Sequence, residues 1–276
     1  MKRKMGTSEL PTAEITFEGA VAYPVGPLES GLANVVGIVL TYSRLTIGLA
    51  SAASMARAAR EAQKYAEFRT AFGREIHQFP MVANQVARLE KYAHRTVAGA
   101  FKLYQAFLRH KDKLSDKLDG SADSAEQKER FDIRELIMFQ KITATWDCTD
   151  VLRGAGAMSI FGGHGVMEDF SALLRLFSDA AINELWEGPR NVLLTQIHRD
   201  LQRAKEWYRP AEFVQNILSG ADAKVIQMFA EEIEALVAHP SLLEPDAETR
   251  NICERWDSLC HRLFHAYQDA AHAEVI

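Results

Sequence analysis

Three short motifs contain residues whose types could take part in binding or catalysis. They are RTAFG at 69–73, FGGHG at 161–165 and LWEGPRN at 185–191. An arginine can bind a phosphate group, and a glycine-rich turn lets the backbone come close to a ligand. A glutamate beside apolar residues can act as a general base. These residue types are compatible with phosphate binding and with proton abstraction, but the types alone establish neither.

Each motif also has a simpler structural explanation when it is taken alone. Arg69 near Gly73 is typical of a helix C-terminus, and the glycine cluster lacks the full spacing of a phosphate-binding loop. Glu187 before Gly188 and Pro189 is typical of a helix start, where proline fits the first helical position and a carboxylate suits the dipole. No motif identifies a function by itself.

In their order and at these separations, the three motifs resemble the acyl-CoA dehydrogenase family. The resemblance extends over residues 6–201 and includes Tyr-Ser-Arg at 42–44, YAEFRTAFGREIHQF at 65–79 and INELWEGPRNVLLTQIHRDL at 182–201. It implies an all-α fold, an up-down four-helix bundle like the family's carboxy-terminal domain. It also implies FAD as cofactor and the α,β-dehydrogenation of an acyl-CoA thioester as the activity.

The resemblance assigns a role to individual residues. Glu187 matches the catalytic glutamate, which removes a proton while the flavin accepts a hydride. Arg69 and Phe72 match the element that meets the FAD of a neighbouring subunit, and Gly162 and Gly163 match a turn that approaches the same nucleotide.

Further matches place residues near the chain's own FAD and near the substrate. Gly188, Pro189 and Asn191 lie where the family contacts the FAD of its own subunit, and Arg44 occupies an arginine position near the catalytic glutamate. We therefore expect Arg44 and Gly188 to contact substrate. A cofactor site built across subunits implies a homodimer or homotetramer.

Four positions differ from the family pattern. Ser159 stands where a longer glutamine commonly contacts the cofactor, and Pro80 replaces another glutamine. Ala71 and Pro189 replace residues that often carry a hydroxyl. Losing such contacts, at about 1 kcal/mol each, would weaken FAD binding. The alternative hypothesis is therefore a non-enzymatic helical oligomerisation module that binds no FAD.

Hydrophobic periodicity predicts the elements that must position these residues. We expect long helices over 31–69, 81–110 and 131–160, a short helix at 172–177 and another at 189–205. The charged stretch 111–130 is predicted to be a solvated connection.

The sequence divides into three predicted regions. Alternating apolar residues over 12–22 predict one strand, so residues 1–28 are interpreted as a remnant of the family's middle β domain. Residues 29–205 form the bundle, and 206–276 form an appended helical subdomain. A full family member has an amino-terminal helical domain and a complete β domain, so a companion chain could supply them.

Composition excludes several other classes of protein. A net charge of −5 with both signs spread along the chain disfavours nucleic-acid binding, and three cysteines favour a reducing compartment, hence the cytoplasm. Arg44 interrupts the apolar stretch 30–56, so no membrane span is predicted. His261 and His265 are four apart with Cys253 and Cys260 nearby, so a transition-metal site is conceivable. Cys253, Trp256, Cys260 and Leu263, however, have the spacing of an apolar helix face, and we predict no metal site.

Overall fold

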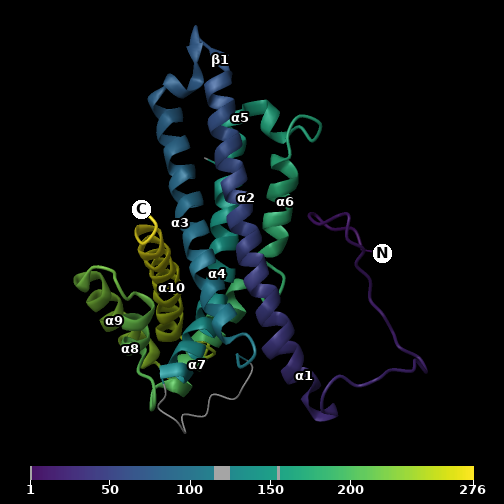
Figure 1. The fold of residues 1–276 in the computed structure, drawn as a ribbon, viewed down its shortest axis with the longest axis vertical. Helices are drawn as coiled ribbons and strands as arrows, with labels where there is room; N and C mark the ends of the chain where they lie inside the picture. Colours follow the sequence, from purple (N-terminus) through teal and green to yellow (C-terminus); the bar gives the residue numbers. More distant parts are fainter. Residues whose placement is uncertain (1, 115–124, 154–155) are drawn as a thin grey trace.

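The computed structural model describes residues 2–114, 125–153 and 156–276, and these fold mainly into helices. In chain order the elements are α1 (Gly31–Asn34), a π-helical stretch (Val35–Leu40), α2 (Thr41–Phe68), β1 (Thr70–Ala71), β2 (Arg74–Glu75), α3 (Pro80–His110), α4 (Ala125–Leu152), α5 (Ala157–Phe161), α6 (Leu173–Asn183), α7 (Arg190–Ala204), α8 (Pro210–Ile217), α9 (Ala223–Val237) and α10 (Ala247–Ala273). Helices α2, α3, α4 and α6 run alternately up and down along the long axis (Figure 1). The predicted all-α bundle is confirmed.

Helix α4 lies at the centre of this bundle and packs against α2, α3 and α6. Every residue from Leu136 to Thr145 is buried, as expected for a helix that is covered on all sides. Helix α2 meets it through small residues, among which Gly48 lies directly against the Gln140 side chain. Small side chains allow two helix backbones to approach closely.

The glycine cluster follows a break in the predicted third helix. Helix α4 ends at Leu152, and the short α5 continues directly into a 3-10 turn, Gly162–Val166. The helix also begins earlier than predicted, at Ala125. Most of the predicted connection over 111–130 cannot be compared, because residues 115–124 lie outside the described residues.

The prediction of a strand over 12–22 is wrong. These residues are extended and mostly exposed, and no strand is assigned to residues 2–27. A strand needs a neighbouring strand to pair its backbone groups. The described residues form only one sheet, the hairpin β1–β2. The extended arm loops away from the bundle (Figure 1), while the Thr7 amide donates to Asp179 of α6 at 2.6 Å.

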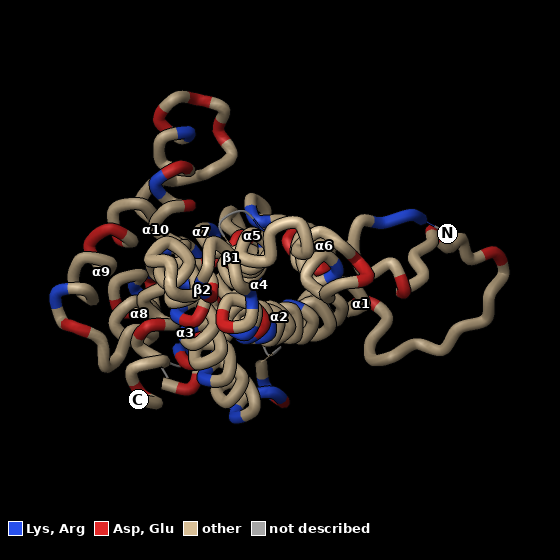
Figure 2. The backbone as a smooth tube through the Cα atoms, turned by 90° about the horizontal axis from the view of Figure 1, so that it is seen from above, with Lys and Arg blue, Asp and Glu red and all other residues tan. Residues whose placement is uncertain are grey.

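Helices α8, α9 and α10 pack beside the bundle, on the side opposite the amino-terminal arm (Figure 2). Their buried residues share one hydrophobic cluster with α4 and α7. Phe213 of α8, for example, stacks on Phe139 of α4 with ring centroids 6.3 Å apart, and Trp256 of α10 donates to the Leu194 carbonyl. The region boundary near 205 stays a prediction, but the core is continuous across it.

Length and composition alone would allow residues Val35–Phe68 to cross a membrane. Within the fold, however, α2 packs against both α3 and α4 and buries Arg44, Met55 and Ala62 there. This packing is that of a core helix in a bundle.

We predict that Gly48→Ala lowers the free energy of unfolding by about 1–3 kcal/mol, because the new methyl group overlaps the buried Gln140 side chain. Gln140 donates to the Leu45 carbonyl at 3.3 Å and cannot move without losing that bond. Gly37→Ala is the control, since nothing lies within 4 Å of its added methyl group. Urea unfolding of both variants tests this, and equal stabilities would contradict the close α2–α4 contact.

Candidate active site

The turn between α6 and α7 carries Glu187 in an unusual backbone conformation. Glu187 has φ of +58° and Gly188 has φ of +101°. A residue other than glycine in this left-handed region costs of order 1–3 kcal/mol, and it persists only where surrounding contacts hold it. The turn therefore holds the backbone of Glu187 in a strained conformation.

Two buried cations hold this turn through its carbonyl groups. Arg44 Nε of α2 donates to the Glu187 carbonyl at 2.9 Å. Lys141 Nζ of α4 donates to the carbonyls of Glu184 at 2.8 Å and Gly188 at 2.7 Å. Arg44 is 7% exposed and Lys141 is 0% exposed. Charge-assisted bonds in a buried site are strong, so these contacts can oppose the strain.

Burial perturbs the charges beneath the turn. It lowers the pKa of Lys141 to about 8, and the positive charge of Arg44 contributes in the same direction. Burial likewise lowers the pKa of Arg44, although Glu187 and Glu135 oppose this shift. Glu135 is 1% exposed, and burial raises its pKa well above the usual value. Displaced pKa values around one turn are typical of functional sites.

The Glu187 side chain is half-buried and follows the half-buried Trp186, over whose ring lies Lys4 Nζ at 5.3 Å from the centroid. Arg44 and Lys141 bond to the main chain of the turn, so the Glu187 carboxylate stays available to a ligand. A fixed carboxylate next to apolar surface can act as a general base for a carbon acid.

A second group of the predicted residues surrounds a hollow of about 300 Å³ at the other end of the bundle. Arg69, Gly162 and Gly163 line it together, with Tyr65 and His164 alongside. The Tyr65 hydroxyl and His164 Nδ1 are 2.9 Å apart, which fixes the wall behind the glycine turn. Gly162 has φ of +59°.

These residues fit a diphosphate group. A Cβ added at Gly162 or Gly163 would meet nothing within 4 Å, so a ligand can reach the backbone there. Arg69 supplies a guanidinium group to the same hollow, and such groups bind phosphate with two parallel hydrogen bonds. The chemistry of this end is therefore suited to a diphosphate group.

Phe72 and Ser159 lie around the same end. Phe72 is at the tip of the hairpin, 95% exposed, with φ of +51°. The Ser159 hydroxyl donates to the Gly156 carbonyl at 2.9 Å and is bonded in turn by the Gln85 amide. Ser159 is thus engaged within the chain, whereas Phe72 is open to an external partner.

Within one chain the two groups do not meet. Arg44 and Arg69 are separated by 25 residues, which correspond to about 37 Å of helix. Pro189 and Asn191, at the start of α7, lie on the Glu187 side and are exposed. One compact ligand could not contact both groups within a single chain; the family resemblance predicts that a second copy supplies one of them. The individual residue roles remain predictions.

Sequence reasoning missed Lys141 and Glu135. Lys141 is the only charged residue between Leu136 and Trp146, within the helix predicted over 131–160. A buried charge needs a partner, so this position carried a signal. Its partners, however, are carbonyl groups more than 40 residues away in sequence, which spacing does not reveal.

The fold and the held turn define an all-helical bundle with a glutamate at one end and an arginine–glycine hollow at the other. Residues 29–202 match the family described as "Acyl-CoA dehydrogenase, C-terminal domain". The chain therefore belongs to the acyl-CoA dehydrogenase family.

Individual relatives agree with this assignment. Acyl-CoA dehydrogenase family member 11 of Caenorhabditis elegans is 28% identical over 199 residues, which cover 72% of this chain and 30% of that protein. The mitochondrial very long-chain specific acyl-CoA dehydrogenase of Homo sapiens is 28% identical over 70% of this chain and 26% of its own length. The chain thus spans about a third or less of these relatives.

Solved structures show the same fold. Bd2924 in its apo form has a TM-score of 0.74 and 23% identity, and the match covers 99% of this chain and 49% of that one. ACDH-11 of Caenorhabditis elegans, in complex with C11-CoA, has a TM-score of 0.70 and 23% identity over 99% and 46%. Both matches include α8, α9 and α10, so these helices belong to a shared fold.

The low pKa of Lys141 predicts a stability change with pH. Between pH 8 and 10.5 the unfolded lysine holds a proton that the folded one has lost, so stability rises with pH. Relative to Lys141→Met, the wild-type free energy of unfolding should rise by up to about 3 kcal/mol across this window. Urea unfolding at several pH values measures it. Lys91→Met, an exposed change on α3, should show no such trend, and a flat difference for Lys141→Met would contradict the shift.

Proposed function

We propose that this chain provides the catalytic base and part of the flavin site for FAD-dependent α,β-dehydrogenation of an acyl-CoA thioester. The observation that carries the proposal is the strained turn, in which Arg44 and Lys141 hold Glu187 with φ of +58°. Family membership supports the reaction class. The structure of an acyl-CoA dehydrogenase from Bacillus anthracis complexed with FAD supports the cofactor.

In this proposal the chain's residues divide into two tasks. Glu187 removes the proton from the carbon next to the thioester carbonyl, while Arg44 and Lys141 keep the turn fixed. FAD, when bound, accepts the hydride from the neighbouring carbon. Arg69, Gly162 and Gly163 would hold its phosphates. Phe72, Gly188, Pro189 and Asn191 would contact the remainder.

The separation of the two ends supports a homodimer or homotetramer. Because Arg44 and Arg69 stand at opposite ends of α2, Arg69 of one copy would complete the site beside Glu187 of another. Assembly then becomes a requirement for cofactor binding, and a monomer would have two half-sites.

Companion domains, from another chain or from further sequence, are the second part of this proposal. The arm and the first helical turns expose large apolar side chains, namely Ile15, Phe17, Val21, Tyr23, Val25, Leu28, Leu32, Val35, Ile38 and Val39. Large apolar side chains exposed in this number usually mark an interaction site. A β domain that covers this surface would also enclose one side of the flavin.

The catalytic role of Glu187 predicts a specific loss. In an assembly with measurable acyl-CoA turnover, Glu187→Gln should lower kcat by at least ~100-fold, since a general base contributes 10²–10⁴. The dissociation constant for FAD should stay within about twofold of the wild-type value, because the amide keeps the shape of the carboxyl group. Glu206→Gln, an exposed change after α7, is the control. Retained turnover would remove Glu187 from this role.

The hollow at Arg69 predicts a selective effect on flavin binding. Arg69→Gln should weaken FAD binding at least ~10-fold through loss of a charge-assisted phosphate contact. Arg74→Gln is a matched change in the same hairpin, where Arg74 stacks over Phe79 at 5.7 Å. Flavin fluorescence titration compares the two, and equal effects would contradict a phosphate site at Arg69.

One observation favours the alternative of an oligomerisation module without FAD. The Ser159 hydroxyl is bonded within the chain at the position where the family commonly has a cofactor-contacting glutamine. This alternative predicts a colourless oligomer whose thermal midpoint is unchanged by FAD. A rise in the midpoint with FAD would exclude it, because a ligand that binds the folded state must stabilise that state.

A further inference from the structure

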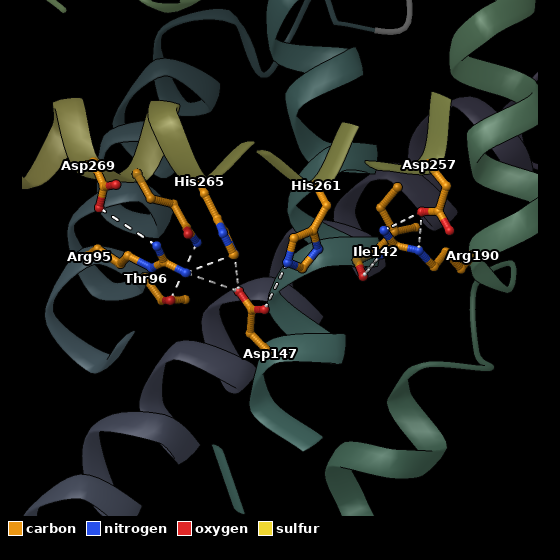
Figure 3. Close-up of polar contacts among 10 residues, drawn as sticks. Arg95, Thr96, Ile142, Asp147, Arg190, Asp257, His261, His265 and Asp269 are labelled. Atoms are coloured by element: carbon orange, nitrogen blue, oxygen red, sulfur yellow. Dashed lines mark hydrogen bonds and ion pairs between the residues drawn. The ribbon is translucent and has the colours of Figure 1, made fainter. Parts of the chain in front are cut away.

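Helix α10 carries four polar residues spaced four apart, along the edge of the face that packs on the bundle (Figure 3). Asp257 at one end pairs with Arg190 of α7, whose Nε lies 2.7 Å from the carboxylate. Asp269 at the other end lies 3.9 Å from Arg95 of α3. Between these two ion pairs, the histidines at 261 and 265 both point toward Asp147 of α4.

The three central side chains bring their ligand atoms close together. His265 Nε2 lies 2.7 Å from Asp147 Oδ2, and His261 Nε2 lies 3.6 Å from Asp147 Oδ1. One ligand atom from each residue falls within 4.8 Å of the others. Two imidazole nitrogens and a carboxylate oxygen form a common three-ligand set for zinc and related ions.

His265 Nε2 lies between a cationic and an anionic neighbour. Its Nε2 lies 2.9 Å from Arg95 Nη2 and 2.7 Å from the Asp147 carboxylate. An arginine can only donate and an ionised carboxylate can only accept, so one nitrogen cannot bond to both. If Nε2 accepts from Arg95, its lone pair also faces an oxygen lone pair. When Nε2 carries a proton, it donates that proton to Asp147 and the bond is satisfied; when it does not, a bound cation can replace the proton as the link between His265 and Asp147.

The position of the cluster suits a bound ion. Asp147 is 3% exposed, and its nearest permanent cation, Arg95, stands 3.9 Å away at Nη2, farther than the imidazole of His265. The side chains of His261 and His265 are 26% and 17% exposed and leave access from solvent. Tyr92 packs edge-on against the His265 ring at 6.0 Å, which orients that ligand. Metal sites need ligands that neighbouring groups hold in position, and Tyr92 holds the His265 ring in this way.

Arg95 opposes metal binding. Its guanidinium is close to the cluster, and like charges repel more strongly where water is excluded. It also has other contacts, with Asp269 at 3.9 Å and over the Tyr92 ring at 4.3 Å. Arg95 therefore limits the affinity of the cluster and competes with any bound cation for Asp147.

We propose that Asp147, His261 and His265 form a site for one divalent transition-metal ion of the zinc type. The ion would join α10 to α4 and so fasten the carboxy-terminal helices to the bundle. Sequence analysis predicted no metal here because the nearby cysteines, Cys253 and Cys260, offered no convincing set. The third ligand comes instead from Asp147, more than 100 residues earlier.

The test is a ZnCl₂ titration of the tag-free chain after chelator treatment and gel filtration, read by calorimetry and by metal analysis. We expect one Zn²⁺ per chain and a higher thermal midpoint with Zn²⁺. His265→Asn and Asp147→Asn should each weaken binding at least ~10-fold, judging from the cost of disturbing metal sites. Arg95→Gln should tighten it by a similar factor.

His272→Asn is the matched control. His272 of α10 stacks on His94 of α3 with ring centroids 5.8 Å apart. The substitution therefore removes a histidine from the same helix without changing any of the three proposed ligands. Circular dichroism checks that every variant is folded. The proposal is overturned if the wild type binds no Zn²⁺, or if His272→Asn weakens binding as much as His265→Asn does. A chain in which only Arg95→Gln binds Zn²⁺ would show that Arg95 is the resident cation, which also overturns it.

Discussion

The candidate site depends on two buried cations that bond to backbone carbonyl groups. Arg44 and Lys141 come from the two central helices, α2 and α4, and converge on a turn that neither helix contains. Burying two like charges is costly, and the lowered pKa of Lys141 reflects that cost. The bundle core, the close α2–α4 contact and the left-handed Glu187 together form one connected arrangement.

The same arrangement links the carboxy-terminal helices to the site. Arg190 directly follows the Glu187 turn, where its Nη1 donates to the Ile142 carbonyl of α4 at 3.0 Å and its Nε bonds to Asp257 of α10. The turn is therefore held from beneath by α4 and from the side by α10. Helices that sequence analysis treats as an appended region thus support the start of α7.

Sequence reasoning predicted the elements well where one periodicity runs without interruption. The helix expected over 81–110 is observed as Pro80–His110, since its apolar stripe and its proline define both face and start. The strand over 12–22 failed because strand formation needs a neighbour that local alternation cannot supply. The pairing of Lys141 with the turn and of Asp147 with α10 was likewise beyond sequence reasoning, since both depend on contacts between distant segments.

In the proposed flavin site, the Glu187 end of one chain meets the Arg69 end of another. In the most direct test, the Arg69→Gln and Asn191→Ala variants are refolded together in equal amounts. The amount of FAD bound per chain is then measured, at an FAD concentration where neither variant alone binds appreciably. In a hybrid dimer one site carries both changes and the other carries neither, so about a quarter of the wild-type flavin should be recovered. Flavin content no higher than that of the two variants alone would contradict the shared site.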